Sequence, residues 1–257
     1  MAKFSNTSNP KLTVMIAGNS AEKVIEVVKK SIEQGAEAFC ILAQGMKPED
    51  KSKESIKRII DATGGKDVYI TNYFRSNSQP DLTDEYLAEQ LLMMLDCGAK
   101  LIDVPTDMFC RSTDEVTRDF YAVQKQKELI SEIHKRGAEV LMSSHIFEYR
   151  SPEQVLEIAK LQQMRGADIA KIVTVANSAK ELDDAFRTNF LLKEKLSIPF
   201  LFLCNGSHCR NHRLLGPVLG SCFYLCLENS NTKGPQPTIE EAKMIREKIQ
   251  SLEENNE

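Results

Sequence analysis

The sequence predicts a (β/α)8 barrel, the TIM-barrel fold, as its fold class. Short apolar runs of strand length alternate with amphipathic segments along the chain, and this alternation is typical of a parallel sheet with right-handed crossovers. Eight such units can be traced, the number that closes into a barrel, and 257 residues suit one barrel of about 250 residues. We therefore assign residues 1–257 to a single domain, preceded by a short polar extension over about 1–10.

Each predicted strand is a run of four to six mostly apolar residues, which is the usual pattern of a buried parallel strand. The strands are predicted at 12–17, 38–42, 68–72, 101–104, 139–143, 169–173, 200–204 and 221–225. An open, doubly wound sheet is the alternative. It is less favoured because the first strand is followed by Ala-Gly-Asn-Ser and not by the glycine-rich turn of dinucleotide-binding sheets.

The segments between the strands carry apolar residues at helical spacing. Helices are predicted at 20–34, 51–62, 83–97, 116–136, 151–165, 178–195 and 238–252. Four predicted helices give way to a Gly-Ala pair, at Gly35, Gly98, Gly137 and Gly166. Glycine accepts the left-handed conformation that ends many helices, so each pair predicts a turn into the next strand.

Composition excludes several classes of partner. The net charge is −4, from 33 basic and 37 acidic residues spread along the chain, so there is no basic stripe for nucleic acid. No apolar stretch approaches the ~20 residues that cross a bilayer, and the first residues lack a signal-peptide core. Most of the seven cysteines stand in apolar runs, as free thiols do in a reducing compartment. We expect a cytoplasmic protein without structural disulfides and without membrane contact.

Two residues of the predicted barrel could carry chemistry. Lys171 lies within the sixth strand between apolar neighbours, and His145 follows the fifth strand. In barrels, the carboxyl ends of the strands form the active site. Burial in apolar surroundings lowers the pKa of a lysine and favours the nucleophilic amine, while a histidine can move protons at neutral pH. The pair predicts an imine-forming enzyme that needs neither a metal nor an organic cofactor.

Arginines are suited to the acid group of a small-molecule ketoacid substrate, because the guanidinium donates two parallel hydrogen bonds to a carboxylate. Arg75 follows the third strand, and Arg213 lies between the seventh and eighth strands. A competing reading is a zinc site formed by Cys204, His208, Cys209 and His212. Their spacing matches no regular zinc pairing, so no metal is predicted.

Several motifs resemble those of the type I 3-dehydroquinate dehydratases. Ser-Ser-His-Ile-Phe at 143–147 looks like the acid/base histidine motif, and Ala-Asp-Ile-Ala-Lys-Ile at 167–172 looks like the imine-lysine motif. Arg213 matches the carboxylate-binding arginine. In a lid segment Gln236 matches and Thr232 replaces a serine.

The resemblance runs from about residue 12 to about residue 245. It implies a barrel that dehydrates 3-dehydroquinate to 3-dehydroshikimate in the shikimate pathway. It further implies that Lys171 forms the imine, that His145 is the general acid/base and that the enzyme is a homodimer.

The sequence also departs from the family. The second strand of the family ends in Glu-x-Arg-x-Asp, whose first two charged residues hold ring hydroxyls, and here Cys40 and Leu42 stand in their places. The glutamate that orients the family histidine falls near Gln79, so we expect His145 to lack a carboxylate partner. Two other functions therefore stay open: another lysine-imine barrel enzyme such as an aldolase, or a non-catalytic paralogue that binds a metabolite.

Overall fold

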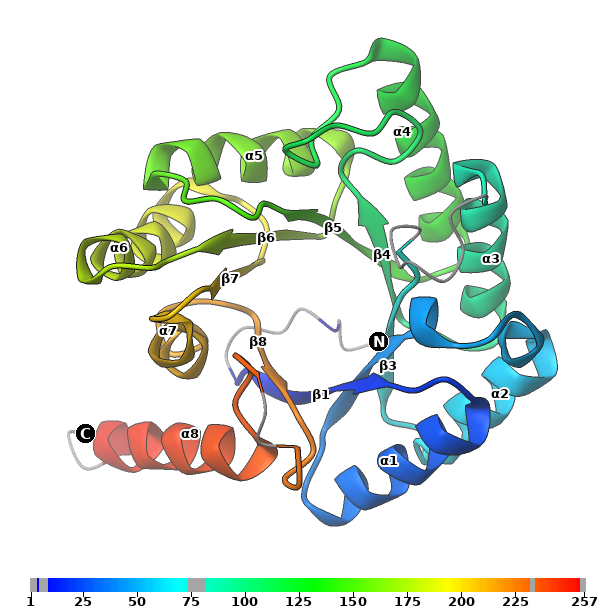
Figure 1. Cartoon of the computed structure of the whole chain (residues 1–257), viewed down its shortest axis with the longest axis horizontal. Coiled ribbons are helices and arrows are strands. Elements are labelled where there is room, and N and C mark those ends of the chain that lie inside the picture. Colours follow the sequence, from blue (N-terminus) through cyan, green and yellow to red (C-terminus); the bar gives the residue numbers. More distant parts are fainter. Residues whose placement is uncertain (1–3, 5–8, 74–81, 232–233, 255–257) are drawn as a thin grey trace.

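Eight parallel strands form the wall of a barrel, and the helices surround it (Figure 1). This computed structural model describes residues 4, 9–73, 82–231 and 234–254. The strands are β1 Lys11–Ala17, β2 Ala38–Leu42, β3 Asp67–Thr71, β4 Leu101–Pro105, β5 Glu139–His145, β6 Ile169–Val175, β7 Phe200–Asn205 and β8 Phe223–Cys226. All eight predicted strands are confirmed, each within two residues at either end.

The order of the strands confirms the predicted fold class. Hydrogen-bonded neighbours follow the order β7-β6-β5-β4-β3-β2-β1-β8, and every pair is parallel. β7 and the segment before β8 meet at a bridge between Phe200 and Ser221, where the Cys222 amide donates to the Phe200 carbonyl at 2.8 Å. We call this contact the seam. It closes the sheet into a barrel.

The helices are α1 Ala21–Glu33, α2 Lys53–Ala62, α3 Asp84–Asp96, α4 Phe120–Lys135, α5 Pro152–Arg165, α6 Ala179–Lys195, α7 Cys209–Leu215 and α8 Ile239–Glu254. Two short 3-10 turns, η1 Ala43–Gly45 and η2 Pro48–Lys51, follow β2. Within the described ranges, no helix has the length and apolar character needed to cross a membrane.

Two helices differ from the prediction. The fourth begins at Phe120, not near Val116, because the Asp119 side chain caps it by accepting from the Ala122 amide. Residues 116–118, just before this cap, are not helical, and they follow the left-handed turn at Glu115, which has a φ of +51°. The sequence does not predict α7, because its seven residues are too few to show a helical period.

The predicted glycine turns are confirmed, and one of them positions the sixth strand. Gly166 ends α5 in the left-handed conformation with a φ of +103°, and its amide donates to carbonyls of the last turn. The chain then enters β6 three residues later. This tight connection fixes where Lys171 lies along the barrel wall.

The polar N-terminal extension contains one buried aromatic residue, Phe4. Its ring packs edge-on against Phe223 and Tyr69, with ring centres 5.4 and 6.4 Å away. Its amide donates to the carboxylate of Glu139, the first residue of β5, at 2.6 Å. Phe4 therefore fills the barrel interior below Tyr69, whose hydroxyl faces the candidate site.

Candidate active site

The side chain of Lys171 points into the barrel and is 5% exposed. Its amine lies 3.3 Å from Oδ2 of Asp103, 2.9 Å from the Tyr73 hydroxyl and 3.2 Å from the Tyr69 hydroxyl. The expectation of largely apolar surroundings for this amine is therefore wrong. A buried charge needs a partner to offset its lost hydration, and Asp103, in the apolar strand β4, provides it.

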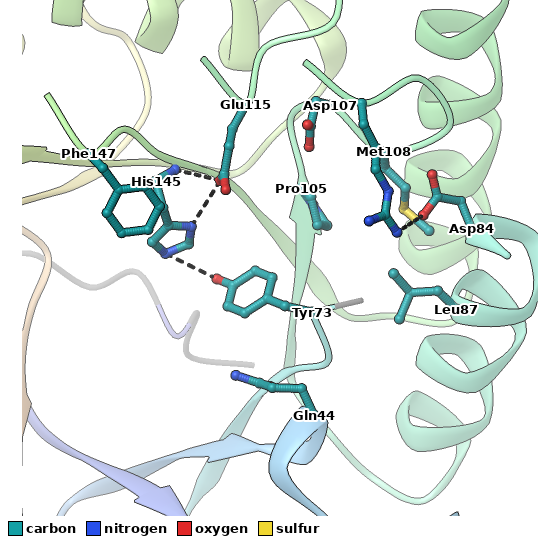
Figure 2. A pocket seen from close by; sticks show the side chains of 11 residues that line it. Gln44, Tyr73, Asp84, Leu87, Pro105, Asp107, Met108, Glu115, His145 and Phe147 are labelled. Carbon is teal, nitrogen blue, oxygen red and sulfur yellow. Dashed lines mark hydrogen bonds and ion pairs between the residues drawn. The ribbon is translucent and has the colours of Figure 1, made fainter. Parts of the chain in front are cut away.

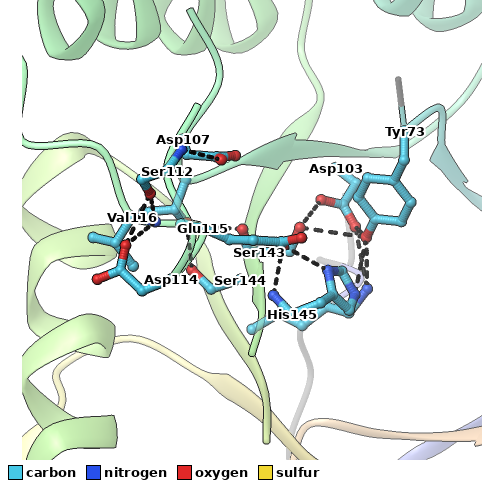
Figure 3. Close-up of polar contacts among 12 residues, drawn as sticks. Tyr73, Asp103, Asp107, Ser112, Asp114, Glu115, Val116, Ser143, Ser144 and His145 are labelled. Atoms are coloured by element: carbon cyan, nitrogen blue, oxygen red, sulfur yellow. Dashed lines mark hydrogen bonds and ion pairs between the residues drawn. The ribbon is translucent and has the colours of Figure 1, made fainter. Parts of the chain in front are cut away.

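Asp103 is the centre of a buried hydrogen-bond network (Figure 3). Its Oδ2 accepts from the hydroxyls of Tyr69 and Tyr73, the latter at 2.5 Å, and its Oδ1 accepts from the Ser143 hydroxyl at 2.5 Å. Burial first, and the Asp103 charge second, raise the pKa of both tyrosines well above the ordinary value. Both phenols therefore keep their protons and act as hydrogen-bond donors at neutral pH.

His145 ends β5 and lies beside this network. Its Nε2 is 3.5 Å from the Tyr73 hydroxyl, and its Nδ1 is 3.2 Å from Oε2 of Glu115. Burial, followed by the charge of Lys171, lowers the pKa of His145, while Glu115 opposes the shift. The imidazole is then neutral at neutral pH, with Nδ1–H donated to Glu115 and the Nε2 lone pair turned toward Tyr73.

Glu115 corrects the expectation that His145 lacks a carboxylate partner. Its Oε2 also accepts from the backbone amide of His145 at 2.6 Å, so one carboxylate oxygen fixes both the main chain and the ring. The residue adopts a φ of +51°, a conformation that costs a non-glycine residue about 1–3 kcal/mol and is often found at functional sites. Glu115 lies 30 positions from His145, and no motif in the sequence connects them.

A cavity of about 380 Å³ opens beside His145 and Tyr73 (Figure 2). A volume of this order suits a small organic ligand. Arg111 lines it and pairs with Asp84 at 3.7 Å. The other lining residues are Gln44, Leu87, Pro105, Asp107, Met108, Glu115 and Phe147. Lys171 is not among them, so Tyr73 connects this cavity to the amine.

Two further predicted residues lie elsewhere on the barrel rim. Arg213, on α7, is 5% exposed and donates to the Cys204 carbonyl at 2.7 Å and to Oδ1 of Asn205 at 2.8 Å. Burial lowers the pKa of Arg213 to about 10, so it stays charged at neutral pH. Gln236 lines a second cavity of about 260 Å³, and its Nε2 lies 3.9 Å from Sδ of Met15.

The structure thus joins Lys171 and His145 through Tyr73, whereas no contact between described residues joins either of them to Arg213 or Gln236. Arg75, Thr232 and Gln79 lie outside the described residues.

One residue of the competing zinc reading, His212, has other partners. The ring of His212 is buried, packs edge-on against Phe202, and its Nε2 lies 2.8 Å from Oδ1 of Asn189. Burial lowers the pKa of His212 to about 3, as expected of a neutral core residue. In the part of the chain that the structure describes, no group of three or more His, Cys, Asp or Glu side chains could hold a metal ion. All seven cysteines are free thiols.

Comparisons with known proteins identify relatives of this chain. A 3-dehydroquinate dehydratase of Pyrococcus abyssi is 24% identical over 236 residues, which cover 91% of this chain and 96% of the relative. A 3-dehydroquinate dehydratase of Alkaliphilus oremlandii is 28% identical over 128 residues, about half the length of each protein.

Solved structures share the fold. The 3-dehydroquinate dehydratase of Geobacillus kaustophilus superposes with a TM-score of 0.82 at 16% identity, covering 95% of this chain and 92% of that one. The type I enzyme of Clostridium difficile gives 0.80 at 16% identity, with 94% and 92% covered. A family model described as type I 3-dehydroquinase matches residues 12–253. The chain therefore belongs to the type I 3-dehydroquinase family.

Proposed function

We propose that the chain is a hydro-lyase that dehydrates 3-dehydroquinate, or a closely related ketoacid, through an imine on Lys171. The observation that carries this proposal is the contact of Lys171 and His145 with one hydroxyl, that of Tyr73. Each of the two has its own carboxylate, Asp103 for the lysine and Glu115 for the histidine. Dehydration of 3-dehydroquinate would place the enzyme in the shikimate pathway.

The chemistry follows from these groups. The Lys171 amine condenses with the substrate ketone and releases water, and the resulting iminium withdraws electrons from the adjacent carbon. His145 removes the proton from that carbon as a general base. It then returns this proton to the leaving hydroxyl, so that a second water departs and a double bond forms. Hydrolysis of the imine restores the lysine.

We assign the substrate carboxylate to Arg213, with Arg75, Gln236 and Thr232 as further binding residues. Two observations support Arg213: it stays charged at neutral pH despite its burial, and the bonds to Cys204 and Asn205 engage two of its nitrogen atoms. A guanidinium has five N–H donors, so donors remain for an anion. The free thiols support a cytoplasmic location, and the family resemblance supports a homodimer.

Borohydride reduction in the presence of a ketone tests the function. With 3-dehydroquinate, the proposed enzyme gives a mass addition on Lys171. An adduct with other ketones but not with 3-dehydroquinate would favour an aldolase or another imine enzyme. No lysine adduct with any ketone would favour a metabolite-binding paralogue.

Turnover of 3-dehydroquinate itself is expected to be weak, with a raised KM. Cys40 and Leu42 stand where the family presents a glutamate and an arginine to the ring hydroxyls, and Cys40 is buried among Tyr69, Leu101 and other apolar residues. Each unmade hydrogen bond to a charged group would cost about 1.5–3 kcal/mol, or about ten- to more than a hundredfold. Steady-state kinetics should show better turnover of a ketoacid with fewer hydroxyls. A kcat/KM on 3-dehydroquinate within the ordinary range of about 10⁴–10⁸ M⁻¹s⁻¹ would contradict this prediction.

Replacement of Glu115 by glutamine should shift the pH dependence of the reaction. Glu115 is the residue that most raises the pKa of His145 against burial, so loss of its charge lowers that pKa further. The acid limb of kcat/KM, which reports the unprotonated histidine, then moves to lower pH. Loss of a charged hydrogen bond that holds the ring should also reduce turnover by about tenfold or more.

Asp114→Asn is the matched control for this variant, because Asp114 neighbours Glu115 but bonds to Ser112 and Arg118. Asp114→Asn should leave both the acid limb of kcat/KM and the turnover rate unchanged. If the acid limb of kcat/KM in Glu115→Gln stays in place or moves to higher pH, Glu115 does not have this positioning role.

A further inference from the structure

The Tyr73 hydroxyl touches both groups that must exchange protons in the proposed reaction. It lies 2.9 Å from the Lys171 amine and 3.5 Å from Nε2 of His145. The same hydroxyl donates to Oδ2 of Asp103 at 2.5 Å, and its oxygen lies 3.3 Å from the Ser143 hydroxyl. Among the described residues, no hydrogen bond joins the Lys171 amine directly to the His145 ring, so Tyr73 is the bridge between them. Figure 2 shows the contact of Tyr73 with His145.

The direction of the hydrogen bonds suits a proton relay. Because the Nδ1–H of His145 is donated to Glu115, Nε2 carries the lone pair and can accept a proton. The Tyr73 oxygen accepts from the Lys171 amine while its own proton is free to turn from Asp103 toward Nε2. Burial and Asp103 raise the pKa of Tyr73, so the phenol passes protons on without remaining ionised.

We infer that Tyr73 is a catalytic residue that relays protons from the Lys171 amine to His145 during imine formation, an inference that rests on the proposed function. When the Lys171 ammonium group condenses with a ketone, the products are the protonated imine and one water. Two protons must therefore leave the nitrogen. Each passes to the Tyr73 oxygen while the Tyr73 proton passes to Nε2. His145 then gives both, one after the other, to the former carbonyl oxygen, which departs as water. After each transfer, Tyr73 and His145 have the same protonation state as before it.

Tyr69 offers a matched control on the same network. Its hydroxyl also contacts the Lys171 amine, at 3.2 Å, and also donates to Asp103. In the described structure, however, its hydroxyl forms no hydrogen bond with His145, and Tyr69 does not line the cavity beside the histidine. Loss of either hydroxyl removes a hydrogen bond from Lys171 and from Asp103. Only loss of the Tyr73 hydroxyl breaks the path to His145.

The test measures the rate of imine formation by rapid mixing with 3-dehydroquinate, quenching with borohydride and mass analysis of Lys171. We expect Tyr73→Phe to slow adduct formation by about 10²–10⁴-fold, the usual contribution of a positioned proton-transfer group, while the final yield at long times is kept. Tyr69→Phe should slow it less than tenfold. The double variant Tyr73→Phe/His145→Ala should be no slower than Tyr73→Phe alone, because both residues serve one path.

Three results would overturn the relay: a wild-type rate in Tyr73→Phe, an equal loss in Tyr69→Phe, or additive losses in the double variant. The failure of the proposed function looks different, since the wild-type protein would then give no Lys171 adduct. Far-ultraviolet circular dichroism of both phenylalanine variants checks that the barrel is intact. A defect shared by both variants is a structural effect and counts against the relay.

Discussion

Lys171→Ala should abolish the borohydride-dependent mass addition and, with it, turnover. An imine needs a primary amine at the reacting carbonyl, and the amine of Lys171 is the one held beside His145 through Tyr73. Alanine would also leave the buried carboxylate of Asp103 without its cation, which costs about 3–5 kcal/mol of folding stability. Lys171→Arg separates the two effects, because it keeps a positive charge but cannot form an imine. It should be folded and inactive.

Lys51→Ala is the matched control for the adduct. Lys51 is also buried, at 7% exposure, burial lowers the pKa of its amine, and this amine lies 3.4 Å from the Asn72 side chain just beyond β3. It does not contact His145 or Tyr73 in the described structure, so its loss should leave the adduct in place. An adduct that persists in Lys171→Ala, or that maps to Lys51 or Lys233, would show that the assignment is wrong.

His145→Ala should reduce turnover by about 10²–10⁴-fold, the typical contribution of a general acid/base, while some imine still forms slowly. The reason is geometric: no other imidazole in the described structure lies beside Tyr73 and Glu115. Steady-state kinetics of the folded variant measure the loss.

His134→Ala is the control, since His134 is exposed on α4 and pairs with Asp168 at 2.7 Å, away from the candidate site. It should keep wild-type turnover. Wild-type turnover in His145→Ala would instead remove this residue from the mechanism.

The sequence predicts the barrel well because its signals are local. A strand such as β2 is a continuous apolar run, which is the usual pattern of a buried parallel strand. Helix ends such as Gly166 are marked by a residue that alone suits the left-handed turn. α7 is not predicted, because seven residues are too few to show a helical period. Its residues Cys209 and His212 suggest a metal site instead.

The partners of the two predicted catalytic residues are harder to predict, because they are set by packing between distant strands. Asp103 stands 68 positions from Lys171, and Tyr73 stands 72 positions from His145. In the sequence each is one polar residue in or after an apolar run. Only the barrel register brings these side chains to one layer, and only the left-handed turn at Glu115 aims its carboxylate at His145.

At the seam, side-chain contacts take the place of part of the backbone hydrogen bonding between strands. The Ser221 hydroxyl stands near the amide and carbonyl of Phe202, at 3.4 and 3.5 Å, and Arg213 donates to the Cys204 carbonyl farther along β7. We therefore expect the wall to part here at a lower free energy than between fully paired strands. If an anion binds Arg213 only while the wall is closed, its binding energy adds directly to the energy of closure. Substrate affinity would then depend on the equilibrium between the open and the closed wall. A substitution that weakens the seam would lower the affinity without any change in the residues that touch the substrate.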